Sequence, residues 1–96
     1  MEIKIKGIRL LEDGDPIVKR DPRAKAVASV VIDNAVIINE IRVCQARQRL
    51  CIVFAENPCP KTDHPEYVVV PTNMEVRQSI ENIVLARYRK AVEMKG

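Results

Sequence analysis

Hydrophobic and polar residues alternate at the start of the chain with the period of two that is typical of a half-buried β-strand. Glu2–Lys6 alternates charged residues with isoleucine, and Ile8–Leu10 resumes the alternation one residue out of phase. A β-bulge at Gly7 would reconcile the two halves, so we predict one bulged strand. The stretch Glu12–Arg23 holds one glycine, two prolines and seven charged residues, and we predict an exposed loop there.

Two further strands are predicted at Lys25–Ile32 and Ala35–Val43, where small and β-branched residues predominate. The dipeptide Asp33-Asn34 lies between them, and both residue types tolerate the left-handed backbone of a tight hairpin turn. A two-residue turn at this point would place Val30 opposite Ile37.

The second half of the chain predicts the rest of a meander and one long helix. A strand at Arg49–Ala55 follows a short loop, and a short strand at Tyr67–Val70 follows a proline-rich segment. Thr72 and Glu75 fit a capping box, and apolar residues at three- and four-residue steps extend a helix to about Glu93. We therefore predict one α+β domain over residues 1–96. It consists of an antiparallel β-meander of about four to five strands and a C-terminal α-helix.

Both faces of this predicted meander are apolar, whereas a face open to water should be mostly polar. We expect the helix to cover one face and a second subunit to cover the other, which gives a homodimer. One face would carry Ala26, Ala28, Val30, Ile37, Ile41, Val43, Leu50, Ile52 and Phe54, and the other Val27, Val31, Val36, Ile38, Cys51 and Val53.

Composition narrows the class of protein. A length of 96 residues with 47% hydrophobic residues is that of one small folded domain. Aromatic residues make up 3% of the chain, which leaves little material for stacking bases. Three cysteines do not indicate a secreted disulfide framework, and no apolar run is long enough to span a membrane. Because Met1–Ile8 does not resemble a signal peptide, we expect a cytoplasmic protein without a membrane partner.

Candidate chemistry is sparse. His64 lies near Cys59, but a structural zinc site needs four ligands and a nucleophilic cysteine needs a positioned base. Cys44 and Cys51 could lie diagonally on one sheet face and are interpreted as small buried hydrophobic residues. The three glycines are isolated, so no phosphate-binding loop is present. We predict that the protein is not an enzyme and has no catalytic residues, metal site or cofactor.

Positive charge is concentrated in three segments. The net formal charge is +3, and residues 19–25, 42–49 and 77–96 each carry a net +3 that acidic segments offset. If the fold and a dimer bring these segments together, they favour binding to nucleic-acid phosphates. For any one segment taken alone, a solvated surface is the alternative interpretation.

Several stretches of the chain together resemble the stage V sporulation protein G family, small bacterial proteins also called septation regulators. The run Lys25–Asn34, continuing through Val36–Val43, is similar to the central hairpin of that family. Pro71–Arg77, with Ile80 and Tyr88 downstream, resembles the segment that opens the family's C-terminal helix. The resemblance implies a homodimer with an antiparallel sheet. It also implies a DNA- and RNA-binding regulator that acts on sporulation, on septation (cell division) or on the transcription of other genes.

The chain departs from the family pattern after the strand at Leu50–Phe54. The family has adjacent basic residues there, associated with nucleic-acid binding, whereas Ala55–Lys61 contains Lys61 alone and the acidic Glu56. Our leading hypothesis is a homodimer that binds DNA or RNA through phosphate contacts. The alternative is a dimeric protein–protein interaction module that has lost nucleic-acid binding. The predicted phosphate-contacting residues are Lys61, Arg47, Arg49 and Arg77, aided by Arg23 and Lys25.

Overall fold

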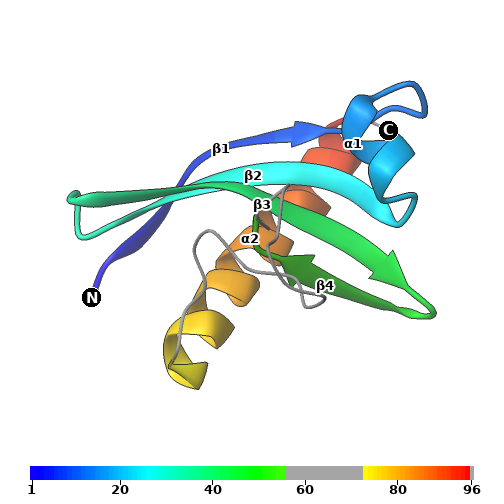
Figure 1. Cartoon of the computed structure of the whole chain (residues 1–96). Helices are drawn as coiled ribbons and strands as arrows, with labels where there is room; N and C mark the ends of the chain where they lie inside the picture. The colour runs from blue at the N-terminus through cyan, green and yellow to red at the C-terminus, as the bar shows by residue number, and fades with distance from the viewer. Residues whose placement is uncertain (56–72, 96) are drawn as a thin grey trace, which may run out of the picture.

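A computed structural model describes residues 1–55 and 73–95 of the chain, and there it confirms the α+β meander. Four antiparallel strands form one sheet in the order β1-β2-β3-β4, and a long helix, α2, follows (Figure 1). The predicted strand at Tyr67–Val70 lies outside the described residues. The elements are β1 Ile3–Leu10, α1 Pro16–Arg20, β2 Ala24–Ile32, β3 Val36–Ala46, β4 Arg49–Val53 and α2 Met74–Lys95.

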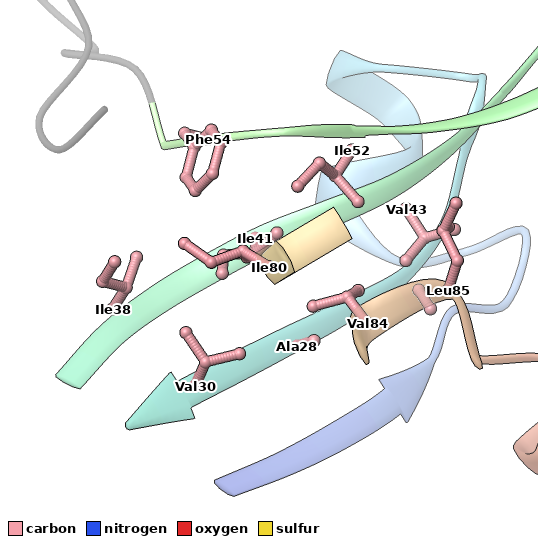
Figure 2. Packing of buried hydrophobic residues seen from close by; sticks show 11 residues of the cluster. Ala28, Val30, Ile38, Ile41, Val43, Ile52, Phe54, Ile80, Val84 and Leu85 are labelled. Atoms are coloured by element: carbon pink, nitrogen blue, oxygen red, sulfur yellow. The ribbon is translucent and has the colours of Figure 1, made fainter. Parts of the chain in front are cut away.

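Helix α2 crosses one face of the sheet, and the main hydrophobic core lies between the two (Figures 1 and 2). Aliphatic side chains from β2, β3 and β4 point toward Ile80, Val84 and Leu85 of the helix. Burial of such side chains stabilises the fold by about 1.5–3 kcal/mol each. The fully enclosed core residues include Ala26, Val30, Ile41, Val43, Ile52, Phe54, Ile80 and Val84.

The hairpin between β2 and β3 has the predicted turn but a different register. Asp33 and Asn34 both have a left-handed backbone, with φ of 52° and 54°. The loop nevertheless spans three residues, so Val30 pairs with Ile38. The predicted partner of Val30 was Ile37, and this part of the prediction is wrong. The difference arises because the strand resumes at Val36, one residue after the position that a two-residue turn requires.

Two β-bulges lie on either side of Ser29 and change which residues face the core. On β1 the register shifts between Ile5 and Gly7, which confirms the predicted bulge. On β3 an extra residue is accommodated at Glu40, whose φ is 56°. Because of this second bulge, Ile38 joins the core at 5% exposure. The prediction that Ile37 faces the core and Ile38 the other side is therefore wrong.

A short helix, α1, covers one end of the far face of the sheet, the face opposite α2. The glycine, prolines and charged residues of this stretch predict an exposed loop, but Ile17 is buried against Ala24 and Cys44. The Asp15 carboxylate caps the helix by accepting from the Ile17 amide at 2.9 Å. A helix of five residues is too short to display a 3.6-residue period, which is why the pattern did not reveal it.

The side chain of Asn73 caps the N-terminus of α2. Its Oδ1 accepts hydrogen bonds from the amides of Glu75 at 2.8 Å and Val76 at 3.3 Å. The predicted cap, Thr72, lies outside the described residues, and the helix begins one residue later than a Thr72 cap requires. The cap fixes the position of the first helical turn, and this turn carries Arg77.

Candidate nucleic-acid interface

The turn between β3 and β4 displays two of the predicted arginines. Arg47 adopts a left-handed backbone with φ of 57° in a turn that joins two directly paired strands. The Gln45 side chain donates to the Arg47 carbonyl at 3.2 Å and braces the turn. Arg49 is the first residue of β4, and both arginine side chains are exposed. The hairpin geometry therefore presents two cations to solvent at one end of the sheet.

Arg77 lies in the first turn of α2, where its guanidinium is stacked on the aromatic ring of Phe54. The guanidinium carbon lies 5.5 Å from the ring centroid, which is cation–π geometry. Phe54 is 1% exposed, so the ring is held by the core and the half-buried arginine lies on a fixed support. This contact limits the directions that the Arg77 charge can take.

Arg49 and Arg77 line the same surface hollow, between β4 and the first turns of α2. The hollow has a volume of about 380 Å³ and contains one acidic side chain, Glu81, beside the two arginines. The fold thus brings together two predicted residues from separate segments, in a cavity large enough for a phosphate group. The lining residues are Ala46, Arg49, Cys51, Met74, Arg77, Gln78 and Glu81.

Arg23 lies at the same end of the sheet, but its charge is shared with a carboxylate. Its carbonyl accepts from the Gln45 amide at 2.9 Å, next to the turn that holds Arg47. Its side chain contacts Asp21 at 3.3 Å, and Asp21 also contacts Arg42 at 3.3 Å. The predicted set did not include Arg42, and no spacing signal could have paired it with an aspartate 21 residues away.

The environment of Asp21 favours its ionised form. Burial tends to raise the pKa of this carboxyl, but hydrogen bonds from Arg23 and from Cys44 outweigh burial and lower the pKa below its ordinary value of 3.8. The carboxylate accepts bonds from the Arg23 amide, the Arg23 and Arg42 side chains and the Cys44 thiol. Asp21 therefore organises the positive residues at this corner and neutralises part of their charge.

Lys25 does not join the arginines. Lys25 lines a different hollow, together with the C-terminal part of α2. Lys61 lies outside the described residues. The structure thus brings Arg49 and Arg77 together, places Arg47 and Arg23 at the same end of the sheet, and separates Lys25 from Arg49 and Arg77.

Cys44 and Cys51 are free and face each other as direct cross-strand partners, rather than diagonally. Burial is the main reason why the pKa of the Cys44 thiol rises to about 11, and the nearby Asp21 charge acts in the same direction. Such a thiol is a poor nucleophile at neutral pH, because its thiolate is scarce.

Residues 1–55 and 73–95 contain no group of three or more histidine, cysteine or acidic side chains that could hold a metal ion. Cys59 and His64, the pair considered for a metal or nucleophilic site, lie outside this part of the chain. Among the described helices, none is both long and apolar enough to cross a membrane.

Comparison with known proteins identifies one family. The family model SpoVG matches residues 2–90. The septation protein SpoVG of Agathobacter rectalis is 30% identical over 79% of this chain and 86% of its own length. The SpoVG protein of Caldanaerobacter subterraneus is 28% identical over 95% of this chain and 93% of its own length. That of Oceanobacillus iheyensis is 32% identical over 79% of this chain and 78% of its own length.

Proposed function

The chain belongs to the SpoVG family of septation proteins, and from this membership and the arginine surface we propose that it is a homodimer that binds DNA or RNA. Family membership supports a role related to septation or sporulation. Within that role, the proposed activity is regulation through contacts to nucleic-acid phosphates. Such contacts position a protein on nucleic acid without reading its sequence.

The observation that carries this proposal is the hollow shared by Arg49 and Arg77, with Arg47 in the adjoining turn. Guanidinium groups bind phosphate oxygens in a bidentate geometry. The contact of Arg77 with the Phe54 ring orients the Arg77 guanidinium before any phosphate binds. Arg23 extends the positive surface at the same end of the sheet, reduced by its contact with Asp21. Aromatic residues make up 3% of the chain, and this scarcity favours backbone contacts over base stacking.

We expect replacement of Arg47 and Arg49 by glutamine to weaken binding to nucleic acid about tenfold. The slope of log affinity against log salt concentration is negative, and it should become shallower by about 2 if each arginine contacts one phosphate. Fluorescence anisotropy with labelled duplex DNA and single-stranded RNA, across a series of salt concentrations, measures both quantities. Arg77→Gln should weaken binding in the same way.

Lys6→Gln provides the matched control for the single variant Arg77→Gln, because Lys6 is an exposed cation on β1 at the bulge opposite Ser29. Its replacement removes the same charge without touching the arginine hollow. Failure of the unmodified protein to bind either nucleic acid at low salt would refute the proposal. An equal loss of affinity in the Lys6 variant would refute the assignment to the arginine surface.

The proposed dimer uses the far face of the sheet beyond the end that α1 covers. Val31 and Ile37 are cross-strand partners there, and Ile37 is 47% exposed. We expect Ile37→Asp to weaken dimerisation at least tenfold, because it places a charge in an apolar contact. Val36→Asp is the matched control, since Val36 is the neighbouring residue, is 53% exposed and points to the opposite face. Sedimentation equilibrium would show dimer dissociation for the first variant only, and a monomeric parent protein would refute the dimer.

A dimeric protein–protein interaction module is the second candidate function. It is favoured by the acidic groups beside the arginines, because Glu81 shares the hollow and Asp21 contacts both Arg23 and Arg42. These carboxylates would repel phosphate. Retention of partner binding in the Arg47 and Arg49 variant, together with no nucleic-acid binding by the parent protein, would support this candidate.

A further inference from the structure

A second hollow lies between the end of β1 and the C-terminal half of α2. Figure 1 shows these two elements at the same end of the molecule. Its volume is about 450 Å³, and most of its lining is apolar. Two lysines, one from β2 and one from the end of α2, complete the lining. We call it the Lys25–Lys95 hollow, and its lining residues are Leu10, Leu11, Lys25, Tyr88, Val92 and Lys95.

A bulge in β2 directs Lys25 into this hollow. The pairing of β2 with β3 shifts register between Ala24 and Ala26, which leaves Lys25 as the extra residue. Ala24 packs into the cluster on the far face and Ala26 into the core beneath α2, so the bulge separates the two packing layers. The Lys25 carbonyl meanwhile accepts from the Leu11 amide at 2.9 Å and fixes the β1 end of the hollow. Bulges commonly redirect a side chain at binding sites in this way.

Helix α2 supplies the other wall through a stripe of residues at helical spacing. Tyr88, Val92 and Lys95 follow one another at steps of four and three, so they share one face of the helix. The same apolar stripe begins in the core at Val84, but by Val92 the side chain is 44% exposed. The apolar face of the helix therefore continues past the edge of the sheet that it covers.

The two lysines differ from most cations of the sheet in their ion pairing within residues 1–55 and 73–95. Among the described residues, neither Lys25 nor Lys95 forms an ion pair, whereas Arg9, Arg20, Arg23 and Arg42 each contact a carboxylate. The acidic residue closest in sequence to Lys95 is Glu93, which is exposed and does not line the hollow. An apolar floor bordered by two ammonium groups is complementary to an apolar group with acidic neighbours.

We propose that the Lys25–Lys95 hollow docks an acidic peptide segment of a partner protein. An apolar side chain of the segment would fill the floor formed by Leu10, Leu11 and Val92, and flanking carboxylates would pair with Lys25 and Lys95. This surface is distinct from the hollow that contains Arg49 and Arg77, so the inference goes beyond the proposed nucleic-acid binding.

Other occupants satisfy this hollow less well. A nucleic-acid backbone would pair with the lysines but would leave the apolar floor without an apolar partner. A second copy of the chain, related by a two-fold axis, would place its own Lys25 and Lys95 against those of the first copy, and repulsion between the like charges disfavours that contact. A peptide supplies both the apolar anchor and the carboxylates.

The test is an NMR titration of the full-length, isotope-labelled protein with a short probe peptide in which two leucines, one helical turn apart, are flanked by glutamates. We expect chemical-shift changes at the residues that line the hollow. Lys25→Glu combined with Lys95→Glu should weaken binding about tenfold, because two favourable surface charge pairs become repulsive. Val92→Asp should also weaken it, and since Val92 is partly exposed the variant should remain folded.

The control variant combines Lys6→Glu with Lys90→Glu, which makes the same change in net charge. Lys90 is exposed on α2, two residues from both Tyr88 and Val92 and therefore on the opposite side of the helix. This variant should bind the peptide as the parent does. The proposal would be overturned if the control variant weakened binding as much as the Lys25 and Lys95 variant. It would also be overturned if a peptide with lysines in place of the glutamates bound equally well, or if the glutamate peptide did not bind. Shifts of the same lining residues caused by a DNA oligonucleotide, or by self-association alone, would also overturn it.

Discussion

Replacing Phe54 by alanine should lower the free energy of unfolding by about 3–5 kcal/mol, as expected when a fully buried aromatic residue is truncated. Phe54 is 1% exposed and lies just after β4, where its ring packs among Ile41, Ile52 and Ile80 of the core (Figure 2). Small domains have little stability in reserve, so this loss would unfold a large fraction of the protein at ambient temperature. Urea denaturation followed by circular dichroism measures the change.

The same ring supports Arg77, so the substitution should also affect the arginine hollow. Phe54→Leu separates the two roles, because it retains much of the buried apolar volume and removes the aromatic face. We expect it to cost about 1–1.5 kcal/mol of stability and still to weaken nucleic-acid binding, as loss of a cation–π contact would. A cost of less than 1 kcal/mol for the alanine variant would contradict the position of Phe54 in the core.

Much of the architecture could be predicted from the sequence, because alternation and helical periodicity directly reflect burial. The positions of β-branched residues predict the strands and the face of the sheet that meets α2. The dipeptide Asp33-Asn34 predicts the hairpin turn. The predicted core face is confirmed apart from the exchange of Ile37 for Ile38. That error arose at Glu40, where an added residue changes the phase of the strand and no local pattern reveals it.

The candidate site was less predictable, because its geometry depends on long-range packing. Arg47 and Arg49 could be assigned to one hairpin from their spacing. The approach of Arg77 to Arg49 could not, since it depends on where α2 crosses the edge of β4. The direction of Lys25 depends on a bulge, and the pairing of Arg42 with Asp21 depends on α1, a helix too short to show a period.

Asp21 links α1 to the sheet, and its replacement by asparagine should cost about 2–3 kcal/mol of stability. Its side chain is 11% exposed and accepts from Arg23, Arg42 and Cys44. Hydrogen bonds to charged groups contribute about 1.5–3 kcal/mol to the free energy of unfolding. The side-chain amide of an asparagine at position 21 would also point its N–H donors at the donors of Arg23 and Arg42. Asp13→Asn is the matched control, because Asp13 is an exposed acid in the preceding loop. Urea denaturation at neutral pH should show a loss for Asp21→Asn and almost none for the control.

The stability that Asp21 provides should also depend on pH, with a sign fixed by its lowered pKa. Hydrogen bonds from arginine and cysteine hold the folded-state pKa below 3.8, whereas in the unfolded chain the carboxyl returns to about 3.9. The unfolded state therefore takes up the proton first as the pH falls, so the contribution is complete above the unfolded pKa and disappears through the folded pKa. The stability difference between the parent protein and Asp21→Asn should be constant from pH 7 to about pH 5 and should shrink below about pH 4. Denaturation series at these pH values measure it, and a difference that grows on acidification would show that Asp21 is not the anionic partner of Arg23 and Arg42.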